Sequence, residues 1–238
     1  MKTLFAVVSA HSREAYREMI RQTWLPLFPQ ENMDVRFFLG RGTGKLKDDE
    51  VSLNCDDSYE GLPEKVQCIA QWALDNGYDR MAKCDDDVVV CPRNLFLSGY
   101  HHGDFIGRFA ATIGGIDVPY GFLYWLSQRG MQYVVSAHLP QDNNDEWWVT
   151  RVLETNGIRL RREELYFVYR GFGARAAHCS RPLRRYVPQD SYPENFVAIC
   201  ITLGTGPEQI PHHYRLAEFL KVFNERVRSL GSSTILNQ

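Results

Sequence analysis

The sequence lacks the paired cysteines and the long apolar runs that mark several protein classes. Its six cysteines form no Cys-x-x-Cys pair and no zinc-ligand spacing, which favours free buried thiols over a disulfide framework or a zinc site. No apolar stretch approaches the ~20 residues that a membrane-spanning helix needs, so no transmembrane segment is expected. The short apolar run at residues 4–10 favours a buried strand over a signal peptide. These absences predict a protein that is cytoplasmic or otherwise soluble in this form.

The sequence also has no large excess of positive or negative charge. The net charge of −2 over 238 residues leaves no basic field to attract nucleic acid, and no nucleic-acid partner is expected. A hydrophobic fraction of 44% and a charged fraction of 24% are typical of globular proteins. Without internal repeats or a low-complexity linker, the chain is expected to form one domain over residues 1–230, followed by a polar tail at 231–238.

Hydrophobic periodicity predicts alternating strands and helices in the first third of the chain. Ser12 is the expected N-cap of the first helix, Pro63 suits the first turn of the second helix, and Gly77 suits its end. We expect strands at residues 4–10, 35–39 and 78–84, and helices at residues 13–24 and 62–76. This order predicts an α/β fold with a mostly parallel central sheet and helices on both faces.

The pattern after Pro92 is less regular. The stretch "GDFIGRFA" at 103–110 predicts a strand, and the aromatic stretch "VPYGFLYWLSQRG" at 118–130 turns helical towards its end. A helix at 146–155 is expected to end at Asn156-Gly157, and residues 213–230 are expected to form an amphipathic helix.

Three adjacent carboxylates follow the third predicted strand in "KCDDDVVV". Asp85, Asp86 and Asp87 repel one another, so they need nearby positive charge to remain ionised together. Lys83 can pair with them or reach a phosphate. A divalent cation is the strongest candidate, and oxygen ligands favour Mg²⁺ or Mn²⁺ over zinc. Because such ions often share their shell with substrate phosphates, a nucleotide diphosphate is the expected partner.

The segment "DDDVV" fits the motifs of more than one class of enzyme. It forms the DxD motif of a nucleotide-sugar glycosyltransferase, but it also matches DxDxV of haloacid dehalogenase-like phosphatases, where Asp85 would be the nucleophile and Asp87 the acid and base. The phosphatase interpretation also needs a later strand that ends in paired acids, and "QDNNDE" at 141–146 is the one candidate. A third possibility is a non-catalytic module that binds sugar or nucleotide.

Three segments together resemble the β-1,3-galactosyltransferase-like family, glycosyltransferase family 31. "REAYREMIRQTW" is similar to the family's RxxIRxTW, "DSYEGLPEK" to DSYxNLTxK, and "KCDDDVVV" to KTDDDVFV, in the family's order. The resemblance is firm over residues 4–90, and "DEWWVTRVLETNGI" extends it to about residue 158.

The resemblance implies a GT-A fold, the Rossmann-like fold of nucleotide-diphospho-sugar transferases. It implies transfer of a hexose, of galactose or N-acetylhexosamine type, from a UDP-sugar to a glycan acceptor, with Mn²⁺ or Mg²⁺, inversion and a β-1,3 linkage. Asp87 would bind the metal, with Asp85 as a further ligand facing the ribose and sugar, and Asp86 would hold the donor sugar. The family's membrane anchor is absent from this sequence, and a Golgi-lumenal location is expected only if an anchor has been removed.

The sequence departs from the family at two functional positions. The family's Glu-Asp pair, whose Asp is its base, is replaced by Asp145-Glu146, so Glu146 is the expected catalytic base and Asp145 remains a candidate. The family's late histidine aligns with a glycine, which leaves His212 or His213 as the possible histidine ligand of the metal.

Further residues are expected to support the donor site. His11 follows the first strand, where a GT-A fold meets uridine, and Lys65 belongs to the matched DSYxNLTxK segment. Arg17 and Arg21 lie one helical turn apart and suit either a phosphate contact or structural ion pairs. Trp147 and Trp148 would stack on the acceptor sugar, raise the pKa of Glu146 by desolvation, or simply pack in the core.

Overall fold

The computed structural model describes residues 1–28, 33–97, 99–163, 166–170 and 198–202. The large sheet contains β1 (Thr3–Val8), β2 (Met33–Leu39), β3 (Glu50–Ser52), β4 (Arg80–Asp85), β6 (Phe105–Ile113), β7 (Ile116–Ser127) and β8 (Arg161–Arg162). A smaller sheet contains β5 (Val88–Val90), β9 (Tyr166–Arg170) and β10 (Ala198–Thr202). The helices are α1 (Glu14–Gln22), α2 (Leu62–Asp75), α3 (Pro92–Leu97), α4 (Gln128–Ser136) and α5 (Asp145–Thr155), with 3₁₀ turns η1 (His11–Arg13) and η2 (Leu25–Leu27).

The strand order of the large sheet is β3-β2-β1-β4-β7-β6-β8. Strands β3, β2, β1 and β4 run parallel, β7 is antiparallel to both β4 and β6, and β8 pairs with β6 in parallel. The expected mostly parallel sheet is therefore confirmed, with an antiparallel hairpin of β6 and β7 added beyond β4.

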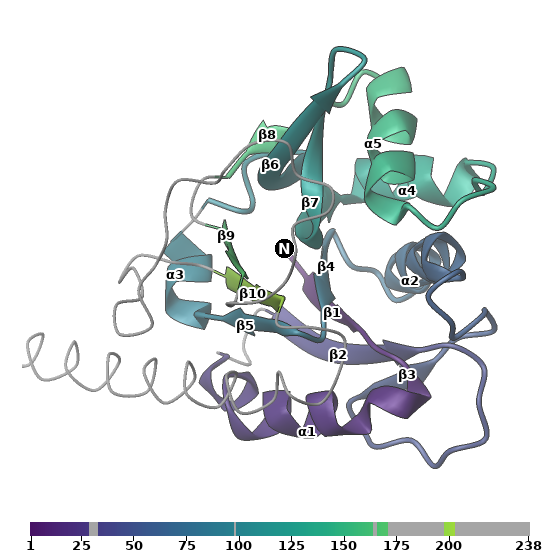
Figure 1. Cartoon of the computed structure of the whole chain (residues 1–238), viewed down its shortest axis with the longest axis vertical. Coiled ribbons are helices and arrows are strands. Elements are labelled where there is room, and N and C mark those ends of the chain that lie inside the picture. Colours follow the sequence, from purple (N-terminus) through teal and green to yellow (C-terminus); the bar gives the residue numbers. More distant parts are fainter. Residues whose placement is uncertain (29–32, 98, 164–165, 171–197, 203–238) are drawn as a thin grey trace, which may run out of the picture.

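Alternation along β1 divides the core into two layers. Phe5 and Val7 join one apolar cluster with residues of α1, α3 and β5, whereas Leu4 and Ala6 join a second cluster with residues of α2, α4 and α5. Figure 1 shows the same arrangement, with α1 below the sheet and α2, α4 and α5 gathered on its other side. Because both faces are covered, β1 is apolar from Leu4 to Val8, in agreement with the apolar run that predicted this strand.

The chain changes direction across the sheet beside β1. It passes from β1 through α1 to β2 and β3 on one side, and α2 then carries it back to β4 on the other side. At such a switch point the two outgoing connections leave in opposite directions and open a crevice at the carboxyl ends of the strands. Here the crevice lies between the ends of β1 and β4, where Val8 is in register with Asp85.

Most of the predicted elements in the first third are confirmed, with boundaries shifted by one or two residues. Gly77 and Gly157 have φ values of 71° and 73°, the left-handed conformation that ends a helix and that glycine adopts without strain. The prediction of Ser12 as an N-cap is wrong. Ser12 lies inside η1, and the residue at the cap position of α1, Arg13, makes no side-chain capping hydrogen bond.

Several expectations lie outside the described residues or are settled within them only in part. The helix expected at 213–230 and the tail at 231–238 fall outside them, so the single-domain boundary stays a prediction. The described cysteines 55, 68 and 84 are free thiols, as expected. None of the described helices combines the length and the apolar character needed to cross a membrane.

Candidate functional site

A cavity of about 450 Å³ occupies the crevice between the carboxyl ends of β1 and β4. Its walls come from the segment after β1, the acidic cluster after β4, and the loop and first turn that lead into α2. This arrangement brings the three aspartates into one pocket, as the sequence predicted. The lining residues are Val8, Ser9, Ala10, Ser12, Arg13, Asp57, Ser58, Tyr59, Leu62, Lys65, Asp85, Asp86 and Asp87.

The middle aspartate is held by a cation from the chain itself. Both oxygens of the buried Asp86 carboxylate accept from Arg13 Nε at 2.8 Å, and Asp86 Oδ2 also accepts from Ser9 Oγ at 2.7 Å. The Arg13 guanidinium lies 3.9 Å from the ring centre of Tyr16, which fixes its plane. Such a two-oxygen contact is among the stronger side-chain pairs, so Asp86 is neutralised and oriented before any ligand arrives.

A buried lysine joins the first aspartate to the start of α5. Lys83, 2% exposed, places Nζ 2.6 Å from Asp85 Oδ1 and 3.5 Å from Asp145 Oδ2, and donates to the Gly121 carbonyl at 2.7 Å. Tyr124 also donates its hydroxyl proton to Asp145 Oδ2 at 3.1 Å. Burial alone would lower the pKa of Lys83, but the two carboxylates outweigh it and raise that pKa. Of the two roles considered for Lys83, the structure shows the pairing with the cluster.

The carboxylate of Asp57 accepts hydrogen bonds from three segments near the cavity and so holds them together. Its carboxylate accepts from Lys65 Nζ at 2.8 Å, from the His11 amide at 2.7 Å and from the Gly40 amide at 2.5 Å. Lys65 also donates to the Ser9 carbonyl at 3.0 Å. Burial opposes ionisation, yet these donors lower the pKa of Asp57 below its ordinary value. The ring of His11 points to the Gly40 carbonyl and lines a neighbouring cavity of about 440 Å³ rather than the aspartate pocket.

In the third aspartate, Asp87, burial and the neighbouring carboxylates disfavour the ionised form. Burial, followed by repulsion from Asp85 and Asp86, raises the pKa of Asp87 to about 7, against an opposing effect of Arg13. Burial also raises the pKa of Asp85, although Lys83 opposes it. In the part of the chain that the structure describes, no group of three His, Cys, Asp or Glu side chains forms a ready metal cage. A cation at Asp87 would relieve this repulsion, and Mg²⁺-type ions commonly use one or two carboxylates plus phosphate oxygens.

The two acidic residues at the start of α5, Asp145 and Glu146, have different surroundings. Asp145 is 3% exposed and held by Lys83, as described above. Glu146 is half-buried, and burial followed by repulsion from Asp145 raises its pKa to about 7. Partial desolvation and then the charges of Glu146 and Asp145 raise the pKa of Tyr59, a pocket residue that is 69% exposed. The Glu146 carboxylate lies against Gly121, whose carbonyl accepts from the same Lys83 that pairs with Asp85 of the cavity wall.

Arg17 and Arg21 attach α1 to β3 rather than lining the aspartate cavity. Arg17 Nε lies 2.8 Å from Glu50 Oε1, and Nη1 donates to Ser9 Oγ at 3.1 Å. The Arg21 guanidinium contacts Asp49 at 2.6 Å and Glu50 at 2.7 Å. These contacts favour the structural role of both arginines over a phosphate contact, while Arg17 still positions the segment after β1.

The two tryptophans at the start of α5 have different surroundings. Trp148 is buried in the core and donates Nε1–H to the His138 carbonyl at 2.9 Å, whereas Trp147 lines a groove on the outer side of α5. The candidate metal ligands His212 and His213 lie outside the described residues.

Sequence inspection missed Arg13 and Tyr59 as site residues. Arg13 begins the helix that follows β1, where the helix dipole disfavours a positive charge. A cation in that position indicates an anionic partner, and this signal could have identified it. In the sequence, Tyr59 stands out only as part of the DSYEGLPEK segment. Its exposure at the cavity mouth depends on how the loop before α2 folds, which the sequence does not show.

No family model matches the sequence, and no curated protein sequence matches it, so membership of glycosyltransferase family 31 stays a prediction. The fold is similar to that of a glycosyltransferase involved in the glycosylation of the major capsid of PBCV-1. The TM-score is 0.52 at 12% identity, and the match covers 89% of this chain and 99% of that chain. The Drosophila β-1,4-galactosyltransferase 7, a mutant in complex with manganese, UDP-Gal and xylobiose, matches with a TM-score of 0.44 at 12% identity over 69% of this chain and 66% of that chain. The PBCV-1 likeness confirms the predicted GT-A-type α/β fold class.

Proposed function

We propose that this protein is an inverting, metal-dependent glycosyltransferase that moves a hexose from a UDP-sugar to a glycan hydroxyl, forming a β-1,3 linkage. The observation that carries the proposal is the cavity at the switch point. It gathers three aspartates at one wall, and Lys83 connects that wall to Gly121, against which the Glu146 carboxylate lies. Inverting transfer needs a charge-neutralising site for the leaving UDP and a separate base for the acceptor, and these two acidic groups provide both.

The donor side of the site is built from the aspartate cluster. Asp87, with Asp85, would hold Mn²⁺ or Mg²⁺, and the ion when bound would neutralise the diphosphate of the leaving UDP. Arg13 fixes the carboxylate of Asp86 towards the cavity, where it can accept a hydrogen bond from a hydroxyl of the donor sugar. His11 and Lys65 position the segment after β1 through Asp57, and the neighbouring cavity lined by His11 suits the uridine.

The acceptor side centres on Glu146. Its ionised form accepts the proton of the incoming hydroxyl, and its raised pKa makes it a stronger base than an exposed glutamate. Asp145 is a poorer base because Lys83 and Tyr124 already hold its Oδ2 atom. It acts instead as a positioning residue, since it ties the first turn of α5 to the lysine that also holds Asp85.

Asp87→Asn is expected to weaken UDP binding by about tenfold or more when Mn²⁺ is present and to leave the weak binding without metal unchanged. The amide removes the charge that would attract the cation but keeps the size of the side chain. Isothermal titration calorimetry with UDP, with and without Mn²⁺, measures both affinities. Asp75→Asn on the exposed side of α2 is the matched control and should bind UDP like the wild type. Equal metal-dependent affinity in Asp87→Asn and wild type would contradict the proposed ligand.

The phosphatase interpretation finds no support in the described residues. It requires a later strand that ends in paired acids, but residues 141–146 lead from α4 into α5 through a loop. It also requires Asp85 to be a free nucleophile, whereas the Lys83 ammonium lies 2.6 Å from its carboxylate. UDP release from UDP-sugars separates the transferase from a non-catalytic sugar- or nucleotide-binding module.

A further inference from the structure

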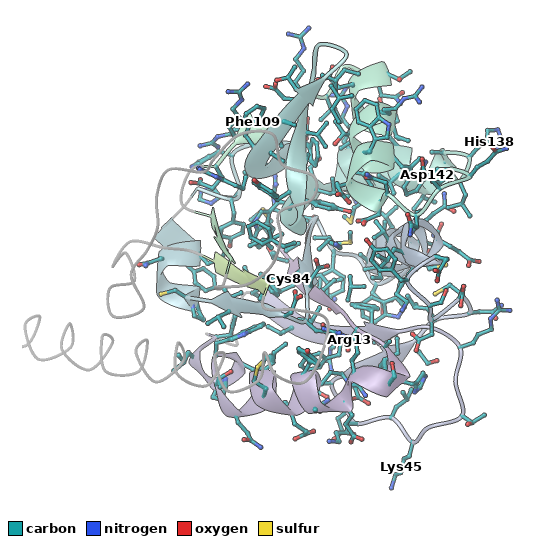
Figure 2. All side chains as sticks on the ribbon, viewed as in Figure 1. Arg13, Lys45, Cys84, Phe109, His138 and Asp142 are labelled. Atoms are coloured by element: carbon teal, nitrogen blue, oxygen red, sulfur yellow. The ribbon has the colours of Figure 1, made fainter. Side chains whose placement is uncertain are left out.

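Gly121 lies where β7 leaves the regular ladder of the large sheet. The pairing of β7 with β4 extends as far as Leu123, opposite Cys84. On its other side β7 pairs with β6 at Pro119, opposite Phe109, and the register shifts here. Figure 2 shows both ends of this stretch, with Cys84 near the centre of the molecule and Phe109 further out on the hairpin. Such irregularities turn groups out of the ladder and often occur next to active sites.

Two groups of the proposed site meet at the backbone of Gly121. Its carbonyl accepts from Lys83 Nζ at 2.7 Å, and the same ammonium lies 2.6 Å from Asp85 in the wall of the aspartate cavity. The open side of its Cα faces the carboxylate of Glu146, in the first turn of α5. A β-carbon built on Gly121 would lie 2.9 Å from Oε2 and 3.1 Å from Cδ of Glu146. Gly121 therefore connects the wall that holds the aspartates with the proposed base.

The absence of a side chain at position 121 is what allows the carboxylate to lie so close to β7. Atoms in contact need about 3.5 Å, so a methyl group on Gly121 would push the Glu146 carboxylate away by about half an ångström. The three atoms nearest to that methyl group all belong to the free end of the Glu146 side chain, and none belongs to the backbone. Gly121 also has no positive φ, so its backbone suits alanine. Alanine should therefore keep the fold and displace the base.

We propose that Gly121 is a positioning residue of the transfer reaction, which sets the place of the Glu146 carboxylate relative to the aspartate cavity. The inference rests on the proposed transferase function and deepens it, since it assigns the placement of the base to β7. A base must lie within hydrogen-bond reach of the hydroxyl that it deprotonates. Because a misplacement of about 1 Å can cost about a hundredfold in rate, a shift of about half that size should cost about tenfold.

Steady-state kinetics of Gly121→Ala test this proposal on the full chain. UDP release is measured at saturating Mn²⁺ from UDP-galactose, UDP-glucose and their N-acetyl forms, with a set of methyl hexosides as acceptors. We expect kcat to fall about tenfold and the KM for the donor to stay unchanged, because the aspartate wall keeps its contacts.

Gly103→Ala is the matched control for the added methyl group. The Gly103 carbonyl also accepts from a buried basic side chain, that of Arg80 at 2.6 Å. A β-carbon on Gly103 would likewise meet a side chain first, that of Ile106 at 3.2 Å. This variant has no contact with Glu146 to lose, and it should show the kcat of the wild type.

A double substitution separates a positioning role from a general structural one. Glu146→Asp lowers kcat by itself because the shorter side chain withdraws its carboxylate from β7, and alanine at position 121 then has no carboxylate to displace. Adding Gly121→Ala to Glu146→Asp should therefore change kcat by less than about twofold, although the same change costs about tenfold in the wild type. A substitution that merely loosened the sheet would lower kcat by the same factor in both backgrounds.

Crystal structures of the wild type and of Gly121→Ala give a readout that does not depend on activity. The variant should keep the backbone of β7 and show a displaced Glu146 carboxylate. Wild-type kcat in Gly121→Ala, equal losses in the two backgrounds, or a raised KM for the donor at unchanged kcat would overturn the proposal. Absence of turnover in the wild type with all four donors would refute the transferase function itself, whereas an undisplaced carboxylate would refute only the role of Gly121.

Discussion

Glu146→Gln is expected to lower turnover by about two to four orders of magnitude while leaving the affinity for UDP unchanged. That range is what a positioned general base contributes to proton transfer. The amide has nearly the same shape as the carboxylate but cannot accept the proton of the acceptor hydroxyl. Initial rates of UDP release from a UDP-sugar with a glycan acceptor measure the loss, and calorimetric titration with UDP measures the binding. Wild-type turnover in this variant would refute the assignment of the base.

With Glu146 as the base, the pKa of its carboxyl determines how the turnover of the wild type depends on pH. Burial and Asp145 raise the pKa of Glu146 to about 7, so the base is ionised above that pH and protonated below it. At saturating Mn²⁺, which would keep Asp87 ionised, turnover should therefore fall as the pH drops through about 7, and this acidic limb should be absent from the residual activity of Glu146→Gln. Glu154→Gln lies two turns further along α5 and is the control, with unchanged rate and profile.

Lys83→Met is expected to lower the free energy of unfolding by about 3 kcal/mol or more, because removing one partner of a buried ion pair leaves the other charge without compensation. Lys83 separates Asp85 from Asp145, with Nζ 2.6 and 3.5 Å from their oxygens. Methionine fills similar volume but lets the two carboxylates repel each other. Urea unfolding measures the change, and UDP affinity should fall in parallel because Asp85 loses its anchor.

Lys47→Met provides the contrast. Lys47 pairs with Glu18 at the surface, where its side chain is 45% exposed, and water and salt screen such pairs so that they contribute little to stability. The two variants remove the same charge from different depths. Equal, small losses of stability in both would show that Lys83 does not hold the two acidic sites together.

The first half of the fold was predictable because its signals are local. An apolar run gives β1, helical spacing gives α1 and α2, and glycine gives the end of α2 at Gly77. Strand β3 was missed because three residues are too few for any periodicity to appear. The hairpin of β6 and β7 was predicted only in part. Register shifts near Phe109 break the alternation of inward-facing and outward-facing residues that identifies a strand in the sequence.

The site was predictable as a set of residue types but not as a set of contacts. Three aspartates at a strand end indicate a ligand site, and that much follows from the sequence. The pairing of Arg13 with Asp86 joins residues 73 positions apart, and no local pattern encodes it. The sequence argument therefore named Lys83 and a metal ion as the neutralising charges and missed Arg13. In the structure Arg13 and Lys83 neutralise two of the carboxylates, and the raised pKa of Asp87 marks where a cation remains favourable.

A crystal structure of the protein with manganese and UDP tests the central claim most directly. The account predicts a metal ion beside the carboxylate of Asp87 and the diphosphate in the cavity between β1 and β4, with Arg13 still bound to Asp86. A cavity that stays free of both at saturating concentrations, or aspartate side chains turned outward to solvent, would contradict it.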